Sequence, residues 1–238
     1  MIIGISGKIS SGKDTVGKII QSLTSIDDWH KENTLFTITE WDGNTDALGK
    51  WKIKKFAGKL KQVASMLTNI PVQMFEDQDF KKTELGPEWN YTKRIYHGIA
   101  PTGYEEFVEA KMTVRDLLQK LGTEAMRDGL HENVWVNSLF SDYVDIWHGL
   151  DTFNNWFEMP KWIITDTRFP NEADAIKKHD GILIRVVRPN QAVTMGMPHP
   201  SETALDDYKF DYEIVNDGSL EDLIEKVRVI LLDTKILS

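Results

Sequence analysis

MIIGISGKISSGKDT, residues 1–15, joins a short apolar run to a loop rich in glycine, serine and lysine. Ile2 to Ser6 have the length and apolar character of a buried strand, and the apolar residues from Val16 to Leu23 recur at helical spacing. The loop therefore connects a strand to a helix. That context is the one a phosphate-binding loop requires.

The loop carries glycine at positions 7 and 12 and a lysine at position 13. Gly7 and Gly12 let the backbone curl so that successive N–H groups point at phosphate oxygens, and the helix start adds the positive end of its dipole. Lys13 is placed to bridge the β- and γ-phosphates of a nucleotide. A plain glycine-rich turn is the alternative, but such a turn has no need for a lysine at the helix start.

Asp14 stands where such loops usually carry a serine or threonine whose hydroxyl binds Mg²⁺, and Thr15 follows it. Three roles stay open. Asp14 could hold the metal through its water shell, Thr15 could contact the α-phosphate, or Asp14 could serve only as an acidic residue at the positive end of the helix dipole. The candidate metal contacts are therefore Asp14 and Thr15.

A second candidate group is WIITDTRFPNE, residues 162–172, in which a buried strand delivers Asp166 and Arg168 at its carboxyl end. Ligands bind at that end of the strands in open α/β sheets. Arg168 can neutralise phosphate charge, and Asp166 and Glu172 can orient a metal-bound water, a ribose hydroxyl or Arg168 itself. A helix cap or a turn is the alternative role for Asp166.

A third group lies on an amphipathic helix predicted over residues 114–125 and just beyond it. Its members are Arg115, Gln119, Thr123 and Arg127. Arginine and amide side chains on one face suit a substrate that carries both a phosphate and a base edge; a charged face in solvent is the alternative. Trp135 either stacks on a base or packs in the core.

The rest of the chain continues the alternation of strand and helix. Apolar runs predict strands at residues 51–56, 162–165, 182–187 and 212–215, and helical periodicity appears at residues 57–67, 136–147, 171–179 and from Ser219, with Asp222 as its capping partner. The pattern predicts an α/β fold with a parallel sheet flanked by helices. We expect a single domain, residues 1–238, in which residues 29–50 and 77–111 are insertions or mobile loops.

Composition excludes several classes of protein. The 238 residues include no cysteine and have a formal net charge of −9, which argues against disulfides, thiolate metal sites and direct nucleic-acid binding along a phosphate track. The first apolar run is too short for a secretory leader, and no run approaches the roughly 18 apolar residues of a membrane span. A cytoplasmic protein without membrane contact is expected.

Five stretches together resemble the phage-type deoxynucleoside monophosphate kinases: GKISSGKDT, RDLLQKLGTEAMRD with the later VWV, TDTRFPNEA, HPSE and YEIVNDGSLEDL. The loop and HPSE are also similar to small P-loop kinases in general, phosphomevalonate kinase included, whereas the middle stretch and DTRFPNEA favour the nucleotide branch. The resemblance implies a P-loop NTPase fold of the nucleoside monophosphate kinase variety, with a core, a monophosphate-binding region and a lid. It also implies ATP and Mg²⁺ as cofactors, a deoxynucleoside monophosphate as substrate, and allows a homodimer.

The resemblance assigns roles to individual residues. For ATP these are Gly7, Lys8, Ser10, Ser11, Gly12, Lys13, Asp14, Thr15 and, near the adenine, Asn216; for the monophosphate they are Arg115, Gly122, Thr123, Arg127, Trp135, Asp166, Arg168 and Glu172, with Lys13, Asp166 and Arg168 as the catalytic set. Family members often carry a basic residue near positions 9 and 10, for which Lys8 is the substitute here. Arg185 and Arg188 are candidate lid cations, although Arg185 could instead pair with an acid. A kinase for another phosphorylated metabolite and a P-loop ATPase or binding module are the rival functions.

Overall fold

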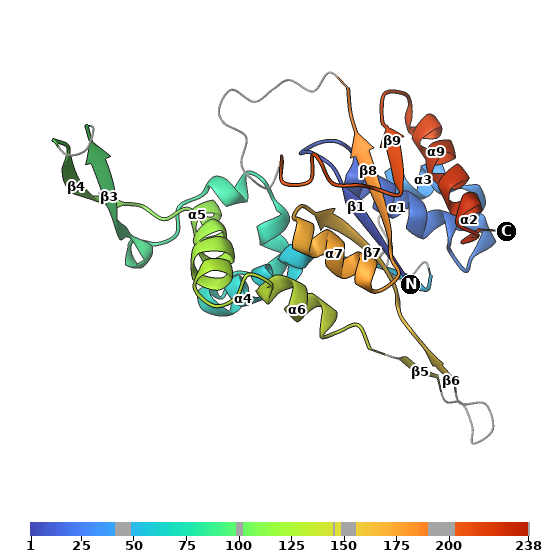
Figure 1. The fold of residues 1–238 in the computed structure, drawn as a ribbon, viewed down its shortest axis with the longest axis horizontal. Helices are drawn as coiled ribbons and strands as arrows, with labels where there is room; N and C mark the ends of the chain where they lie inside the picture. The colour runs from blue at the N-terminus through green and yellow to red at the C-terminus, as the bar shows by residue number, and fades with distance from the viewer. Residues whose placement is uncertain (41–48, 99–101, 145, 149–155, 190–202, 238) are drawn as a thin grey trace. The chain divides into compact units, whose positions relative to one another are not determined.

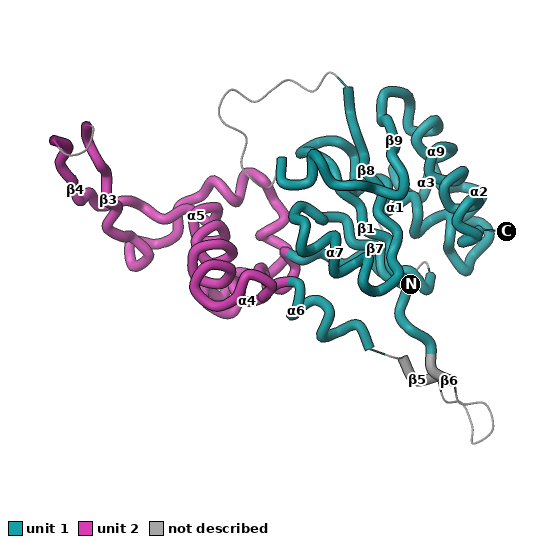
Figure 2. Tube along the Cα trace, in the orientation of Figure 1, with its two compact units in different colours: residues 1–56, 136–238 teal, residues 57–135 magenta. Residues whose placement is uncertain are grey.

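The computed structural model describes residues 1–238 apart from 41–48, 99–101, 145, 149–155, 190–202 and 238. The chain divides into two compact units, residues 1–56 with 136–238 and residues 57–135 (Figure 2). We refer to them as unit 1 and unit 2. The HPSE stretch, residues 199–202, lies outside the described residues.

Unit 1 contains a five-stranded sheet in which each strand runs parallel to its neighbours. In sheet order the strands are β2 (Trp51–Lys54), β7 (Lys161–Thr167), β1 (Ile2–Ser6), β8 (Ile182–Val187) and β9 (Tyr212–Val215). The predicted α/β fold with a parallel sheet is confirmed. Because parallel strands need crossover connections, helical segments follow β1, β2 and β7 before the chain enters its next strand of the sheet.

Helices cover both faces of this sheet (Figure 1). The helices of unit 1 are α1 (Lys13–Leu23), α2 (Asp28–Glu32), which packs on α1 and α3, α3 (Thr34–Thr39), α6 (Val134–Phe140, whose first two residues belong to unit 2), α7 (Pro170–Lys178) and α9 (Leu220–Asp233). Helices α1 and α9 pack with Ile3 and Ile5 of β1, whereas α6 and α7 pack with Ile2. Successive strand residues point to opposite faces, so an unbroken apolar run suits a strand that is covered on both sides.

Two predicted elements end earlier than expected. The strand predicted over 51–56 stops at Lys54. Phe56, which is buried, is already the first residue of α4. The helix predicted over 136–147 stops at Phe140, and Val144 is exposed. Tyr143 has turned off the helix, since its ring packs edge-on against Trp162 and its hydroxyl accepts a hydrogen bond from the Met1 ammonium at 2.8 Å. A two-stranded antiparallel pair follows, β5 (Ile146–His148) with β6 (Trp156–Glu158).

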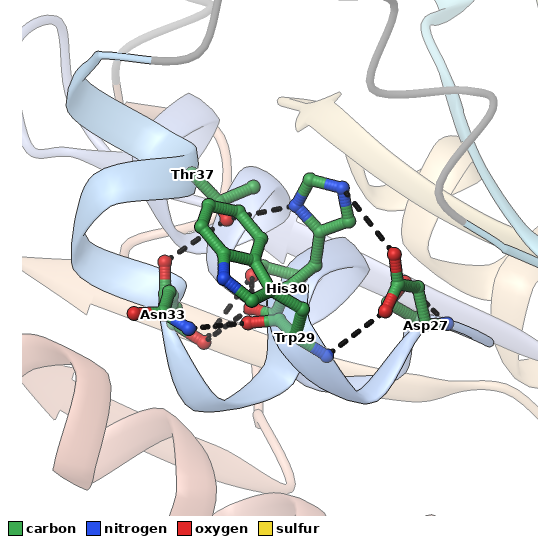
Figure 3. Close-up of polar contacts among 8 residues, drawn as sticks. Asp27, Trp29, His30, Asn33 and Thr37 are labelled. Atoms are coloured by element: carbon green, nitrogen blue, oxygen red, sulfur yellow. Dashed lines mark hydrogen bonds and ion pairs between the residues drawn. The ribbon is translucent and has the colours of Figure 1, made fainter.

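Residues 28–39, which overlap the start of the predicted 29–50 insertion, form the two short helices α2 (Asp28–Glu32) and α3 (Thr34–Thr39). Local polar contacts hold them, as Figure 3 shows. The Asp27 carboxylate caps α2 by accepting from the Trp29 N–H at 2.9 Å, and the Thr37 hydroxyl donates to the Asn33 carbonyl at 2.9 Å. His30 Nδ1 lies 3.1 Å from the Thr37 hydroxyl and joins the two helices.

Unit 2 has its own small core, formed by Ala64, Phe75, Val114 and Leu117. Its elements are α4 (Phe56–Thr68, which begins at the last residue of unit 1), the 3₁₀ turns η2 (Val72–Glu76), η3 (Phe80–Lys82) and η4 (Pro87–Trp89), the antiparallel strands β3 (Tyr91–His97) and β4 (Tyr104–Ala110), α5 (Val114–Gln119) and the π-helix η5 (Lys120–Asp128). The 77–111 segment therefore contains a β-hairpin and short turns.

The predicted helix over 114–125 changes its winding at Lys120 from α to π. Each π-helical hydrogen bond spans five residues in place of four, so positions beyond Lys120 rotate away from the α-helical stripe. Ala125, expected on the apolar stripe, is consequently exposed. In the part of the chain that the structure describes, no helix combines the length and the hydropathy needed to cross a membrane.

Candidate functional site

The loop between β1 and α1 is held in a tight turn by hydrogen bonds within its own backbone. The Ser11 N–H donates to the Lys8 carbonyl at 3.1 Å, and the Gly12 carbonyl accepts from Val16 N–H at 2.9 Å as the first bond of α1. Ser10 and Gly12 both have positive φ, 62° and 100°, and glycine adopts that conformation at little cost. The predicted curled loop at a helix N-terminus is present, and such a loop directs backbone N–H groups toward an anion.

Lys13, the first residue of α1, is almost buried, with 8% of its surface exposed. Its ammonium donates to the Lys8 carbonyl at 3.3 Å, so the side chain folds back along the loop and does not extend into solvent. A lysine in this position is held against the loop by its own helix. The ammonium charge therefore lies where the loop N–H groups also concentrate positive potential.

Asn216, at the turn after β9, braces the loop. Its Nδ2 donates to the Ser11 carbonyl at 2.8 Å, and its backbone N–H donates to the Val187 carbonyl at 2.7 Å. A β-carbon at Gly12 would lie 2.6 Å from Asn216 Nδ2, so only glycine fits against this brace. The contact with the loop is a role that the sequence did not indicate for Asn216; its proximity to an adenine stays a prediction.

Asp14 is held by two partners from neighbouring strand ends. Its Oδ1 accepts from the Thr165 hydroxyl at 2.9 Å and lies 3.1 Å from the Lys55 ammonium. Burial raises the pKa of the Asp14 carboxyl, but the charge and hydrogen bond of Lys55, with the Thr165 hydroxyl, outweigh burial and hold the pKa below its ordinary value. Ionised Asp14 therefore stabilises the folded state above its unfolded-state pKa, and this contribution is lost only as pH falls through the lower folded-state pKa.

Lys55 is a site residue that sequence reasoning missed. It belongs to no recognised motif, because a lysine after a strand is common on protein surfaces. The usable signal was its position: it follows β2, whose carboxyl end meets the carboxyl end of the other parallel strands.

Asp166 and Glu172 both act as caps. Asp166 Oδ1 accepts from the Phe56 N–H at 2.8 Å, at the start of α4, which confirms the cap role that was one alternative for this residue. Glu172 is 2% exposed, and its Oε2 accepts from the N–H groups of Arg168 and Phe169 at 2.8 and 3.2 Å. The backbone of Arg168 is therefore fixed by a buried carboxylate. Direct contacts of these acids with a substrate stay predictions.

The candidate lid cations Arg185 and Arg188 belong to unit 1, and both donate hydrogen bonds to other residues of unit 1. Arg185 pairs with Asp206 at 2.6 Å and also donates to the Leu205 carbonyl at 2.7 Å, so the alternative of an acid partner is confirmed. Arg188 reaches the Ser10 carbonyl of the loop at 3.5 Å. Lys8 lies 3.9 Å from Asp206 as well.

Unit 2 holds the third group, and three of its residues, Gly122, Thr123 and Arg127, lie in the π-helix η5. Such π-helical turns often occur at functional sites. The Trp135 indole N–H donates to the Gly122 carbonyl at 2.9 Å, and Trp135 is 5% exposed, which confirms a core position for this ring. Stacking of Trp135 on a base stays a prediction.

The polar stripe on α5 and η5 is exposed at Arg115, Gln119 and Thr123. The Arg115 guanidinium lies 3.4 Å from the Gln78 side-chain oxygen. A β-carbon at Gly122 would lie 2.9 Å from a methyl group of Leu60, so close helix packing requires the small residue there. The predicted residues thus fall into a group in unit 1, with the loop, Asp166, Arg168, Glu172 and Asn216, and a group in unit 2.

A parallel sheet whose first strand ends in a curled glycine loop, with a buried lysine at the following helix start, defines a P-loop nucleotide-binding protein of the α/β class. The family model of deoxynucleotide monophosphate kinase matches residues 60–227. The chain belongs to this family. The resemblance inferred from the sequence, and the P-loop fold that it implied, are confirmed.

Similar curated proteins come from phages. The "Deoxynucleotide monophosphate kinase" of Enterobacteria phage T4 is 35% identical over 121 residues, 51% of this chain and 46% of the phage protein. The "Deoxynucleoside-5'-monophosphate kinase" of Escherichia phage T5 is 24% identical over 252 residues, 91% of this chain and 89% of that protein. The "Deoxynucleotide monophosphate kinase" of Escherichia phage RB69 is 31% identical over 119 residues, 50% and 45% of the two chains. The alignments with the T4 and RB69 proteins thus span about half of each.

Proposed function

We propose that the protein transfers the γ-phosphoryl group of ATP to a deoxynucleoside monophosphate, giving ADP and the deoxynucleoside diphosphate. The observation that carries this proposal is the curled loop with buried Lys13, in a chain that belongs to the deoxynucleotide monophosphate kinase family. The net charge of −9 fits free nucleotides as substrates better than a nucleic-acid track.

In this proposal, the protein catalyses the reaction by positioning the two substrates and by neutralising the negative charge of their phosphates. The loop N–H groups and Lys13 bind the donor phosphates, and Lys13 and Arg168 stabilise the charge that develops on the transferring group. Arg115 and Arg127 of unit 2 bind the acceptor phosphate, for which the guanidinium group offers paired donors. No covalent intermediate on the protein is needed, and exclusion of water favours transfer over hydrolysis.

Buried polar atoms of the loop fit a phosphate ligand. Ser11 is 1% exposed, and its hydroxyl has no hydrogen-bond partner among the residues that the structure describes. Gly7 packs so closely that a β-carbon there would clash with the Ser11 hydroxyl and would lie only 2.5 Å from the Val186 carbonyl. A loop with an unpaired hydroxyl and no room for a side chain is suited to bind the oxygens of an anion.

Few protein side chains near the loop are candidates to bind Mg²⁺. The described residues contain no group of three or more His, Asp or Glu side chains arranged to hold a metal ion. We therefore propose that Mg²⁺ is bound mainly by nucleotide phosphates and water molecules, and that the protein contributes one side chain, either Asp14 or Thr15. Mg²⁺ would supply charge neutralisation between the β- and γ-phosphates.

The metal contact is tested by two variants of neighbouring residues. If the Asp14 carboxylate holds the metal or its water shell, Asp14→Asn raises the Mg²⁺ concentration for half-maximal activity much more than Thr15→Val, because loss of a charge weakens binding of a hard cation. The measurement is a Mg²⁺ titration of initial rates at saturating ATP. The reverse order assigns the contact to Thr15, and small equal effects restore the helix-dipole role of Asp14.

The proposed reaction is tested by ADP formation with and without an added monophosphate. We expect at least one deoxynucleoside monophosphate, with dGMP and dTMP as the first choices from the family resemblance, to stimulate ADP formation well above the rate in water alone. Mevalonate phosphate should give no stimulation. A P-loop ATPase would instead form ADP without an acceptor. A kinase for another metabolite would show no stimulation of ADP formation by any nucleoside monophosphate.

Arginine variants separate phosphate binding from base selection. Removing Arg115, Arg127 or Arg168 should raise KM or lower kcat for all accepted nucleotides alike, because these substrates share the phosphate. The ranking of bases should hardly change. A variant of these arginines that reorders the bases would contradict their assignment to the phosphate.

A further inference from the structure

Thr167, the last residue of β7, has a buried hydroxyl without a protein partner. The residue is 1% exposed, and Oγ1 makes no hydrogen bond to any residue that the structure describes. An unpaired buried hydroxyl disfavours the folded state, and such groups in native proteins usually mark a bound water or a ligand.

Thr167 is also one of the residues that line a small pocket of about 20 Å³ beside the loop. The pocket is lined by Ser6, Gly7, Lys8, Thr167, Arg168, Arg185, Leu205 and Asp206. Three of these side chains are cationic and one is a carboxylate, a net charge of +2 on the lining. Asp206 engages Arg185 at 2.6 Å but lies 3.9 Å from Lys8, so the lining keeps a positive balance that attracts an anion.

The position of the pocket in the sheet also favours a ligand. Thr167 and Ser6 are register partners at the carboxyl ends of the adjacent strands β7 and β1, and the register between these strands shifts between Gly4 and Ser6. Irregular pairing of this kind re-aims side chains next to binding sites. The carboxyl ends of parallel strands are where open α/β sheets bind ligands.

We propose that the Thr167 hydroxyl donates a hydrogen bond to a phosphoryl oxygen of the nucleotide held by the loop. The proposal rests on the proposed function for the identity of the ligand, a phosphate ester of a nucleotide. The oxygen belongs either to the donor triphosphate or to the acceptor monophosphate. A hydroxyl adds a directional donor to a site in which Lys8, Arg168 and Arg185 supply charge.

The experiment compares Thr167→Val, which keeps the shape but removes the hydroxyl, with Thr167→Ser, which keeps the hydroxyl. For each protein we measure the free energy of unfolding without ligand and the Kd for a non-hydrolysable ATP analogue and for dGMP and dTMP. Thr167→Val should be as stable as the parent or more stable, because no protein hydrogen bond is lost. Its Kd for one ligand class should rise about tenfold, the loss expected for a hydrogen bond to a charged group, whereas Thr167→Ser stays within about threefold.

The neighbouring Thr165→Val is the contrast, since the Thr165 hydroxyl is paired with Asp14 and its loss should lower stability. A rise in Kd for the ATP analogue assigns Thr167 to the donor, and a rise for the monophosphate assigns it to the acceptor. If Thr167→Val leaves every Kd unchanged, the proposal is overturned whether or not stability changes, and a loss of stability then shows that the hydroxyl holds a structural water. If Thr167→Val does not fold, Thr167→Ala takes its place in the same measurements.

The binding measurements keep this proposal separate from the proposed function. A parent protein that binds the ATP analogue but phosphorylates no nucleotide contradicts the kinase activity, while the Kd ratio of Thr167→Val still decides the role of the hydroxyl. A parent protein that binds neither ligand contradicts both.

Discussion

Lys13→Met is expected to lower kcat by on the order of 10²-fold or more, while the protein stays folded. Lys13 is buried to 8% exposure against its own loop, so its ammonium is positioned before the substrate binds and needs no reorganisation during transfer. Methionine retains the apolar stem of the side chain and removes the ammonium, with its charge and its hydrogen bond to the Lys8 carbonyl. The measurement is steady-state kinetics with ATP and the best monophosphate, alongside a thermal unfolding curve.

Lys18→Ala is the matched control, because Lys18 lies on the same helix and is exposed. Its kcat should equal that of the parent. A folded Lys13→Met protein with near-normal turnover would contradict the proposal that the loop and Lys13 bind the transferring phosphate.

Glu172→Ala is expected to destabilise the protein by about 2–4 kcal/mol, because two part-buried N–H groups lose a charged acceptor. The Oε2 atom of Glu172 receives the N–H groups of Arg168 and Phe169 at the start of α7. The same loss frees the backbone of Arg168, so kcat/KM should fall in addition to stability. Urea unfolding and kinetics at a temperature where the variant is folded measure the two effects.

Glu172→Gln should cost less than Glu172→Ala, since the amide oxygen can still accept both hydrogen bonds. A Glu172→Ala protein within about 0.5 kcal/mol of the parent, the range of an ordinary surface substitution, would show that the capping contact adds little.

The sheet of unit 1 could be predicted from the sequence because its strands are covered on both faces. Continuous apolar runs at Ile2–Ser6 and Ile182–Val187 match β1 and β8, and the Ser219 cap with Asp222 matches the start of α9. In these segments, local pattern and tertiary environment demand the same residues.

The rest depended on contacts between distant residues. Nothing local to Tyr143 indicates that it leaves a helix to pack on Trp162, and nothing in the apolar stripe indicates π-winding after Lys120. In the candidate site, the loop was predictable because its backbone needs glycine, whereas Lys55 was not, because its partner Asp14 is 41 positions earlier in the chain. The caps formed by Asp166 and Glu172 likewise depend on which N–H groups the fold brings near them.

The strand order of the central sheet requires contacts between segments that lie far apart in the chain. The first strand, β1, pairs with β7 and β8, in a register that joins Ile2 to Trp162 and Ile3 to Ile182. Contacts this far apart in the chain close long loops and slow folding. Unit 2, residues 57–135, is a continuous segment with its own apolar cluster, so during synthesis its contacts become available while β1 still lacks both of its neighbours. An exposed apolar strand of this kind is prone to aggregation, so β1 is expected to be exposed to aggregation until both of its neighbours, β7 and β8, have been synthesised.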